Sequence, residues 1–553
     1  MMEYPFLNLV EAPGRYIGKE INSCTKDWAS AKVKICFAFP ETYELGMSNL
    51  GWRLLYEIVN SQRTYLGERV FAPSPSLEQI LREKGIPLSS LESNTPLSKF
   101  DVIGVTLASE LSYSNLLTIL SLGGITLQSE ERGEDEPLVI AGGNGAFAPE
   151  PMAPFCDAFF VGEGEEVILA ILKTIQETAK EPRRERLRAL SRLPGVYVPL
   201  FYQPQYNEDN VYLGLVPKEK SFPEQIKRVI ITDFENAPFC ENWVVPYLQI
   251  VHDRIGVEIM RGCMNRCRFC QARVIYGPCR IRSPEKIYQL VITAFKKTGY
   301  EEVSLLSLSS GDYPYLPQLK ELLSPFCRKK NLKISFPSLR FDTFSLTETN
   351  LEKGKKPVAL TFAPESSERM RTWLNKNLKD AELWEQIRVA RAKGWRHIKL
   401  YFMLGLPGEN DQDIREVANL IMEMSKVINL NLSFNTFIPK PHTPLERCGM
   451  AKEEEIDQKI RFLKERFRRN RSLSYSFHLY KQSLLEAVLA RGDRTVGQAI
   501  VKAWKKGARF DGRKEFFRFD LWQEAMAEMG VNYEMFLKEQ PEGAVLPWSH
   551  IVI

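Results

Sequence analysis

Short apolar runs alternate with amphipathic stretches along the first third of the chain. Strand-like runs occupy residues 32–39, 69–71, 101–107, 137–141 and 157–161. Apolar side chains recur at helical spacing between them, in residues 47–60, 76–84 and 113–122. Continuous apolar strands that alternate with helices are typical of a parallel sheet covered on both faces. The pattern predicts a doubly wound, Rossmann-like α/β domain over residues 1–180.

A second alternation of strands and helices follows a proline-rich connector at residues 181–250. Its strand-like runs cover residues 256–260, 302–306, 333–336, 358–362, 397–403 and 431–437, with helical patterns between them. Six strands separated by helices predict a partial (β/α)6 TIM-like barrel over residues 251–447.

The last segment, residues 448–553, reads as helical and basic. Seven cations fall within thirteen residues, opposed by Glu465 alone: Lys459, Arg461, Lys464, Arg466, Arg468, Arg469 and Arg471. A solvated helix face explains such a run, and an electrostatic footprint for RNA phosphates is the functional alternative. The aromatic residues that follow, Tyr475, Phe477 and Tyr480, either stack on bases or pack in the core.

Composition narrows the class of protein. The 553 residues are 44% hydrophobic and 26% charged with a net charge of +5, as in an ordinary globular protein of three or four structural units. No apolar run approaches the roughly 18 residues of a membrane helix, and residues 1–15 do not resemble a signal peptide. We therefore expect a cytoplasmic protein. Ten mostly scattered cysteines do not form a disulfide framework.

Three of the cysteines lie within eight residues, directly after the first barrel strand. The segment reads Arg261-Gly262-Cys263-Met264-Asn265-Arg266-Cys267-Arg268-Phe269-Cys270. Three thiolates at this spacing can hold three irons of a [4Fe–4S] cluster and leave the fourth iron open. Structural zinc is the alternative, but it usually takes a fourth Cys or His, for which only nearby His252 is at hand.

The motif CxxxCxφC, with Phe269 as its aromatic residue, resembles that of the radical S-adenosylmethionine superfamily. The resemblance implies that the amine and carboxylate of S-adenosylmethionine chelate the open iron. One electron, from a reductant such as flavodoxin or ferredoxin, then cleaves the sulfonium, and the 5′-deoxyadenosyl radical abstracts a substrate hydrogen. In such a cofactor-borne reaction the protein supplies position and excludes water.

The same resemblance implies cofactor-binding residues at the ends of the barrel strands. Ser309, Ser310 and Asp312 occupy the place of the motif that binds the methionyl amine, although the usual motif is Gly-Gly-Glu. Arg340 would pair with the methionyl carboxylate and Glu365 with the ribose hydroxyls. Gly405 belongs to a turn similar to the one that contacts adenine. Each polar residue has helix capping or turn formation as its alternative role.

A doubly wound domain ahead of such a barrel resembles the cobalamin-binding domain of a subclass of these enzymes. Three segments further resemble an uncharacterised subfamily, often encoded with or fused to a small radical-enzyme-associated partner domain: residues 39–48, 400–403 and 439–444. The cobalamin fingerprint Asp-x-His-x-x-Gly is missing, since no His precedes His252. Cobalamin bound without a protein imidazole, a different ligand and a purely structural role all remain open.

The leading hypothesis is therefore a radical enzyme that modifies RNA or a ribosome-associated macromolecule, with cobalamin-dependent methylation as one form and a small metabolite as another substrate. A non-catalytic iron–sulfur or RNA-binding adaptor protein is the first alternative. A methylthiotransferase is the second, and it would need a further cluster. The remaining upstream cysteines, Cys24, Cys36, Cys156 and Cys240, are too irregularly spaced to suggest one.

Overall fold

The computed structural model describes residues 7–335 and 360–553. Its N-terminal sheet has the order β2-β1-β3-β4-β5-β6, in which every neighbouring pair is parallel except β5 and β6. The strands are β1 (Val33–Phe39), β2 (Tyr65–Phe71), β3 (Val102–Thr106), β4 (Leu138–Gly142), β5 (Ala158–Phe160) and β6 (Val196–Tyr197). The predicted doubly wound sheet is confirmed.

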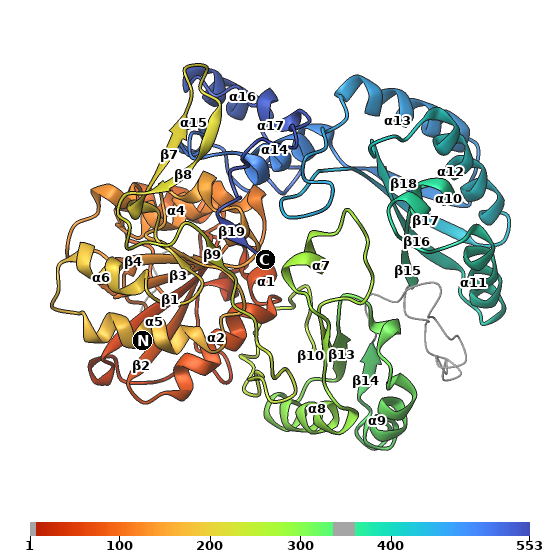
Figure 1. Ribbon diagram of the computed structural model, residues 1–553. Helices are drawn as coiled ribbons and strands as arrows, with labels where there is room; N and C mark the ends of the chain where they lie inside the picture. Colours follow the sequence, from red (N-terminus) through yellow and green to blue (C-terminus); the bar gives the residue numbers. More distant parts are fainter. Residues whose placement is uncertain (1–6, 336–359) are drawn as a thin grey trace.

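Helices cover both faces of this sheet (Figure 1): α2 (Leu50–Ser61), α3 (Pro75–Lys84), α4 (Tyr113–Leu122), α5 (Val167–Glu177) and α6 (Arg183–Leu190). Helix α4 is buried at nine of its ten residues. It is enclosed because α15 (Val496–Lys506), from the far end of the chain, packs against it.

The C-terminal helices share the hydrophobic core of the N-terminal domain. Helices α14 (Tyr480–Arg491), α15 and α16 (Phe519–Glu528) contribute buried Leu485, Val488, Ile500 and Trp522 to the cluster that contains the strands of the first sheet. Residues that begin and end the sequence therefore form one packed body, beside which the barrel lies (Figure 1).

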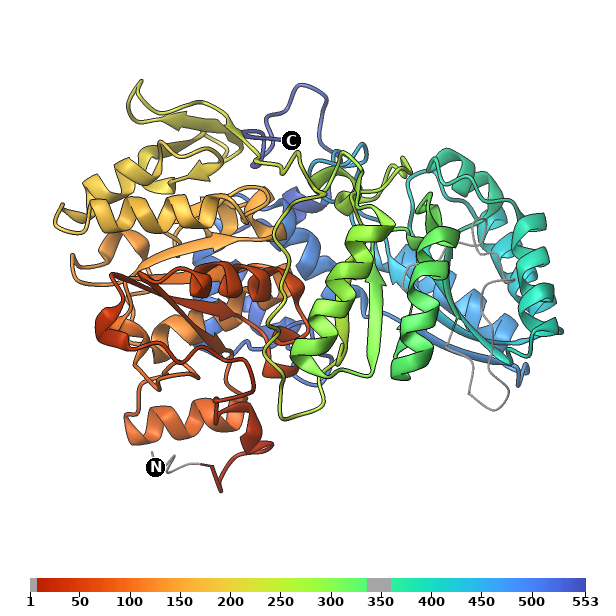
Figure 2. The ribbon, with the colours of Figure 1, turned by 90° about the horizontal axis from the view of Figure 1, so that it is seen from below.

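The barrel strands form two parallel sheets. The first has β10 (Ile255–Glu258), β13 (Glu302–Leu306) and β14 (Lys333–Ser335). The second has β15 (Leu360–Glu365), β16 (His397–Leu404), β17 (Asn429–Thr436) and β18 (Leu473–Phe477). The helices that join the strands lie outside, with α8 (Pro284–Thr298) and α9 (Leu316–Lys330) side by side in Figure 2. The others are α10 (Glu368–Trp373), α11 (Asp380–Ala392), α12 (Asp411–Met424) and α13 (Glu453–Phe467).

Strand β18 lies in the segment that the sequence predicts to be helical. Its side chains alternate between half-buried and exposed, and Tyr475 and Phe477 pack on Phe467 of α13 and Phe434 of β17, respectively. These aromatics thus belong to the core of the second barrel sheet. Five residues of alternating character are too short a signal to outweigh the helical stretches on both sides.

Short elements connect the large units: α1 (Tyr43–Gly46), α7 (Gln271–Ile275), α17 (Glu534–Leu537) and the pairs β7 (Tyr202–Tyr206) with β8 (Tyr212–Pro217), β9 (Ile226–Lys227) with β19 (Ile551–Val552) and β11 (Met260–Arg261) with β12 (Arg280–Ile281). Among the described residues, no helix is long and apolar enough to cross a membrane.

Candidate active site

The three clustered cysteines lie on a loop whose ends are held together. Strand β11 enters this loop and β12 leaves it, and the two pair in antiparallel fashion. Gly262 begins the turn with φ 84°, and a Cβ there would lie 2.7 Å from the carbonyl oxygen of Pro278. Only glycine suits both the backbone conformation and this close approach. The loop therefore presents Cys263, Cys267 and Cys270 in a defined frame, each half-buried.

Two of the thiols accept hydrogen bonds from nearby N–H groups. Cys270 caps the start of α7, where its Sγ accepts from the backbone N–H of Arg273 at 3.4 Å. Burial raises the pKa of the Cys270 thiol. In residues 7–335 and 360–553, no three Cys, His, Asp or Glu side chains are close enough together to hold a metal ion as they stand.

Asn265 connects the cysteine loop to the turn after β13. Its Nδ2 donates to Asp312 Oδ2 at 2.6 Å and lies 3.5 Å from the Sγ of Cys263. Ser309 Oγ donates to the same carboxylate oxygen at 2.7 Å. Ser310 Oγ instead donates to the carbonyl of Leu305 at 3.2 Å, which anchors the turn to its own strand. The structure thus brings Ser309 and Asp312 next to the cysteines, whereas the hydroxyl of Ser310 holds the backbone.

Glu365 ends β15 in an unusual backbone conformation. Its φ is 72°, and the register between β15 and β16 shifts between Phe362 and Glu365. A left-handed non-glycine residue costs roughly 1–3 kcal/mol and is often found at a functional site. The Glu365 carboxylate accepts from Lys376 Nζ at 2.9 Å, and both side chains are largely buried.

Lys376, which is not predicted from the sequence as a site residue, lies between Glu365 and the cysteine loop. Its Nζ stands 5.8 Å from the ring centroid of Phe269, and its charge opposes the effect of burial on the pKa of Cys270. An isolated Lys after a short helix carries no sequence signal. Only the fold reveals that residue 376 returns to the cysteines.

Backbone contacts hold the residues before Lys376 against the cysteine loop. Leu374 accepts at its carbonyl from the N–H of Arg268 at 2.9 Å, and Asn375 Nδ2 donates to the carbonyl of Arg266 at 3.0 Å. Three consecutive residues, 374–376, therefore contact the loop. The segment after α10 forms one wall of the site.

Gly405 forms the turn after β16, with φ 80° and a hypothetical Cβ only 2.7 Å from Ala451 Cβ. Its N–H donates to Glu409 Oε2 at 2.8 Å, and Lys459 Nζ donates to the same oxygen at 2.8 Å. Burial raises the pKa of Glu409 and Lys459 opposes that shift. Lys459 therefore supports the turn from inside, although it belongs to the basic run. Arg340 lies outside the described residues.

Buried ion pairs attach the N-terminal domain to the cysteine loop. Arg280 donates to both carboxylate oxygens of Glu163, at 2.6 and 2.8 Å, just after β5. Arg261, two residues before Cys263, contacts Glu165 at 2.8 Å and Glu258 at 2.7 Å. Because one partner alone would be an unpaired buried charge, these contacts fix the loop relative to the first sheet.

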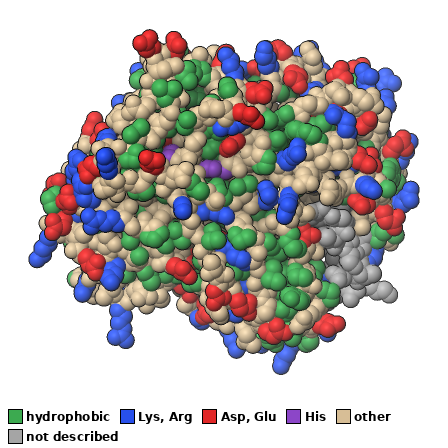
Figure 3. Space-filling model, viewed as in Figure 1, with side chains coloured by type: hydrophobic (Ala, Val, Ile, Leu, Met, Phe, Trp, Pro, Cys, Tyr) green, Lys and Arg blue, Asp and Glu red, His purple; other side chains and the backbone are tan. Residues whose placement is uncertain are grey.

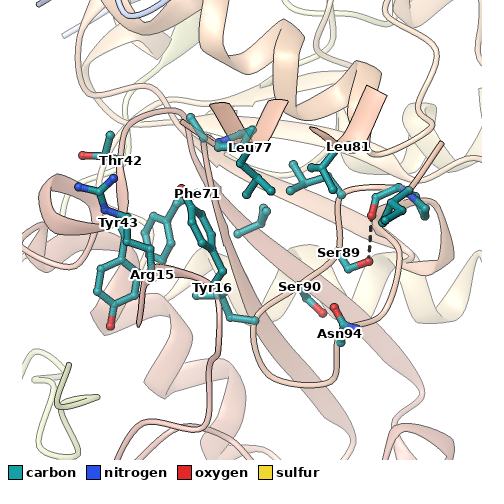
Figure 4. A pocket seen from close by; sticks show the side chains of 17 residues that line it. Arg15, Tyr16, Thr42, Tyr43, Phe71, Leu77, Leu81, Ser89, Ser90 and Asn94 are labelled. Carbon is teal, nitrogen blue, oxygen red and sulfur yellow. Dashed lines mark hydrogen bonds between the residues drawn. The ribbon is translucent and has the colours of Figure 1, made fainter. Parts of the chain in front are cut away.

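The N-terminal domain contains a cavity of about 400 Å³ beside the carboxyl ends of β1 and β2 (Figure 4). Its wall is mainly apolar, with Phe71, Leu77 and Leu81 among the lining side chains, and its lining includes no His, Cys or Met. Elsewhere along the same edge of the sheet, polar groups of the chain form hydrogen bonds with one another. Asn115 Nδ2 donates to the carbonyl of Pro40 at 3.0 Å, and Asn115 Oδ1 accepts from the N–H of Phe510 at 2.8 Å.

Two family models match this chain in regions that correspond to the two α/β units. The model described as radical SAM proteins, N-terminal, matches residues 51–199, and the model of the radical SAM superfamily matches residues 257–421. The second range contains the cysteine loop and the ends of β13, β15 and β16. The chain belongs to the radical S-adenosylmethionine superfamily.

An uncharacterised protein of Methanocaldococcus jannaschii is 28% identical over 76% of this chain and 84% of its own length. The ribosomal protein uS12 methylthiotransferase RimO of Thermoanaerobacter is 26% identical over 30% of this chain. The tRNA-2-methylthio-N(6)-dimethylallyladenosine synthase of Thermus thermophilus is 25% identical over 43%. The chain spans only 40% and 51% of the lengths of these two enzymes.

Among solved structures, the radical S-adenosylmethionine methyltransferase TsrM from Kitasatospora setae, with cobalamin and a [4Fe–4S] cluster bound, superposes with a TM-score of 0.47. The match has 12% sequence identity and covers 75% of this chain and 77% of that one.

Proposed function

We propose that this protein is a radical enzyme that binds a [4Fe–4S] cluster through Cys263, Cys267 and Cys270 and reductively cleaves S-adenosylmethionine. The observation that carries the proposal is Asn265, which joins Cys263 to the Asp312 carboxylate within one hydrogen-bonded unit. A thiolate loop and an ammonium-binding carboxylate held this close suit a ligand that contacts both. Three half-buried thiols, two of which accept hydrogen bonds from N–H groups, also suit an iron–sulfur cluster, which the loop would bind by drawing the thiols together.

The cluster, when bound, supplies the electron that cleaves the sulfonium bond. The residues of this chain orient S-adenosylmethionine for that step. Asp312 accepts a hydrogen bond from the methionyl amine, with Ser309 fixing the carboxylate of Asp312. Lys376 pairs with the methionyl carboxylate. Glu365, which forms an ion pair with Lys376 in the structure, accepts hydrogen bonds from the ribose hydroxyls. The turn at Gly405 admits adenine.

We assign the contact with the methionyl carboxylate to Lys376 instead of Arg340. Lys376 is a largely buried cation 5.8 Å from the ring of Phe269, so it lies beside the loop that would hold the cluster. Burial in a site of low dielectric strengthens its attraction to a carboxylate. Arg340 remains a second candidate for the same role.

Cobalamin bound to the described residues of the N-terminal domain would have no protein imidazole on its cobalt. The cavity in Figure 4 has no imidazole in its lining, and nearby polar groups at the sheet edge are already paired with one another. His442, a histidine that reaches this domain, places its Nε2 2.7 Å from the carbonyl oxygen of Phe147. We therefore assign no step to cobalamin, and methylation through it is not part of the proposal.

RNA or a ribosome-associated macromolecule is the substrate class that we propose. Six cations of the basic run are exposed on α13 and the loop after it: Arg461, Lys464, Arg466, Arg468, Arg469 and Arg471. Cations grouped in this way attract phosphates. The similarity to methylthiotransferases of tRNA and of a ribosomal protein supports the same class. On the face shown in Figure 3, by contrast, acidic and basic side chains are interspersed.

A second cluster, as a methylthiotransferase would need, has no support among the upstream cysteines. Cys36 and Cys156 are buried in the core of the N-terminal domain, and Cys240 is buried in a separate apolar cluster beside Trp243. We also propose that the reductant is a flavodoxin or ferredoxin and that a small radical-enzyme-associated protein is a partner of this chain.

Anaerobic reconstitution with iron and sulfide tests the proposal. Reduced protein incubated with S-adenosylmethionine should release 5′-deoxyadenosine. Lys376→Met should lower that rate about tenfold or more, since one charge-assisted contact is lost, and Lys376→Arg should restore part of it. Lys329→Met, at an exposed position on α9, is the control and should leave the rate unchanged. Protein with an intact cluster that forms no 5′-deoxyadenosine would refute the enzyme assignment.

A further inference from the structure

A second cavity, of about 410 Å³, lies between the β7–β8 hairpin and the C-terminal helices that pack on the N-terminal domain. The β7–β8 hairpin forms one wall, and the segments around α16, α17 and residues 544–548 form the others. Figure 1 shows this hairpin, in yellow, beside the blue C-terminal helices. Neither the family assignment nor the proposed reaction gives the cavity a role.

Asp493 lines this cavity and is only 4% exposed. Its Oδ1 accepts from the N–H of Thr495 at 2.9 Å and from Thr495 Oγ1 at 2.5 Å. Its Oδ2 receives no hydrogen bond from the described part of the chain, and no Lys or Arg there forms an ion pair with it. Burial raises the pKa of Asp493. A buried carboxylate that no cation contacts is costly. A positively charged ligand would therefore stabilise Asp493.

Tyr206, on the hairpin wall of the same cavity, has a hydroxyl that is buried without a hydrogen-bond partner in the described structure. Burial raises the pKa of Tyr206, and the charges of Asp493 and Glu150 raise it further. Leaving a buried hydroxyl unpaired costs about 1–3 kcal/mol. The hydroxyl and the carboxylate are therefore both available to a ligand.

The arginines near these groups are already engaged. Arg494, whose charge acts on both Asp493 and Tyr206, pairs with Glu150 at 3.0 Å and donates to the Tyr197 hydroxyl at 2.9 Å. Arg491 also lines the cavity, and its NH1 donates to the carbonyls of Pro439, Glu446 and Cys448 while its NH2 donates to that of Lys538. Its Nε has no hydrogen-bond partner in the described residues. Burial lowers the pKa of Arg491 to about 10. Four carbonyl dipoles thus compensate Arg491 and Glu150 compensates Arg494, whereas the hydrogen bonds that the Asp493 carboxylate accepts from the described residues come from Thr495 alone.

Aromatic side chains complete the lining. Tyr212 meets Tyr206 edge to face across the hairpin, with ring centroids 5.8 Å apart, and Phe536 and Trp548 come from the C-terminal segments. Aromatic faces beside a carboxylate are a common arrangement for binding organic cations. A mainly apolar cavity of this size with a few polar groups also matches a small-molecule site.

We propose that this cavity binds a small organic ammonium ion. The ammonium group pairs with Asp493 Oδ2 and donates to the Tyr206 oxygen, and its hydrocarbon part packs on Tyr212, Phe536 and Trp548. The site is independent of the radical chemistry, because it lies on a different body of the protein from the barrel.

Three probes of one shape and different charge test this proposal on the full-length protein by isothermal titration calorimetry: 2-phenylethylamine, 2-phenylethanol and 3-phenylpropionate. We expect the amine to bind at least tenfold more tightly than the alcohol and the acid. Binding of the alcohol or the acid as tightly as the amine would overturn the proposal, as would failure of the amine to bind at millimolar concentration.

Two variants locate the site. Asp493→Asn retains an acceptor for Thr495 and should weaken amine binding about tenfold or more, because the charge is lost. Tyr206→Phe should weaken it a fewfold and, without ligand, should not lower the melting temperature, since the hydroxyl has no protein partner to lose. Asp209→Asn, at an exposed carboxylate of the cavity rim, is the control and should bind within twofold of wild type. Unchanged amine binding by Asp493→Asn would contradict the assignment.

Discussion

The N-terminal sheet and the barrel sheets both place polar side chains at the carboxyl ends of parallel strands. In the N-terminal domain the chain itself satisfies several of these groups. Lys440 pairs with Glu110 and Glu486, each at 2.8 Å, and Ser114 Oγ donates to Asp511 at 2.7 Å. In the barrel, the corresponding ends carry half-buried thiols, the strained Glu365 and the Asp312 carboxylate.

The difference lies in where the C-terminal segment goes. Helices α14 to α16 pack on the first domain and contribute the groups that cover its edge, whereas the barrel edge is left to the cysteine loop and residues 374–376. The parallel sheet of the N-terminal domain thus has a supporting role, whereas the parallel sheets of the barrel carry the proposed ligand site. The Glu163–Arg280 and Glu165–Arg261 pairs join the two.

The largest effect should come from the barrel edge. Cys267→Ala removes one of three proposed cluster ligands and should abolish the absorbance near roughly 400 nm and all 5′-deoxyadenosine formation. The unfolding midpoint of the N-terminal domain should not change, because contacts within the chain stabilise the edge of its sheet without the cluster. Cys327→Ala, at a buried cysteine of α9, should keep the cluster and serves as the control. Full iron binding by Cys267→Ala would contradict the ligand assignment.

The next effect should appear in the N-terminal domain. Arg69, fully buried in β2, pairs with Glu20 at 2.6 Å and Glu92 at 2.5 Å. Arg69→Met leaves two buried carboxylates unpaired and should lower the free energy of unfolding by about 3–5 kcal/mol. Denaturant unfolding measures it. Lys502→Met breaks the exposed pair with Glu528 and should cost at most about 1 kcal/mol. Equal losses in both variants would mean that this core does not depend on its ion pairs.

The stability of the folded protein should depend on pH because His550, near the C-terminus, is buried. Burial lowers the pKa of His550 to about 4, and its ring packs on Tyr197 with centroids 4.8 Å apart. Between about pH 6.5 and 4 the unfolded chain takes up a proton that the folded chain does not, so stability should fall as the pH falls through this window. The full change is on the order of 3 kcal/mol. His550→Phe should flatten the profile of unfolding midpoint against pH, and an unchanged slope would exclude His550 as its source.

The smallest change in stability should come from Glu365. Replacement by Gly removes the ion pair with Lys376 but also releases the strain at φ 72°, so the free energy of unfolding should change by less than about 1 kcal/mol. Affinity for S-adenosylmethionine should nevertheless fall about tenfold, as expected for a lost ribose contact. Asn331→Gly relieves a similar conformation, φ 53°, at the end of α9 and should leave that affinity unchanged. A loss in both variants would point to backbone flexibility as the cause.

The hydrophobic pattern was enough to predict the strands of both α/β units. Strands β1, β2 and β4 are buried along almost their whole length and are mainly apolar, whereas β16 and β17 alternate between buried and more exposed residues, and both patterns are typical of strands. All six predicted barrel strands are present among the described residues, and residues 336, 358 and 359 of two predictions lie outside them. The sequence also predicted that the cysteines follow the first barrel strand and that Glu365 and Gly405 lie at strand ends, which is where the structure has them. These features depend on residues close together in the sequence.

The features that the sequence did not predict depend on contacts between distant residues. Lys376 reaches Phe269, 107 positions earlier in the sequence, and Asn265 reaches Asp312, 47 positions later. Similarly, α4 is buried all round only because α15 returns to it from the C-terminal segment. Local periodicity contains no record of such contacts, and a single polar residue such as Asn265 does not stand out within a motif dominated by cysteines.

The most direct test of the central claim is electron paramagnetic resonance of the reduced, reconstituted protein with and without S-adenosylmethionine. If the cysteine loop holds a cluster with one open iron beside Asp312 and Lys376, adding S-adenosylmethionine should change the spectrum of wild type at concentrations that leave Lys376→Met unchanged. A reduced cluster whose spectrum is the same with saturating S-adenosylmethionine would contradict the account.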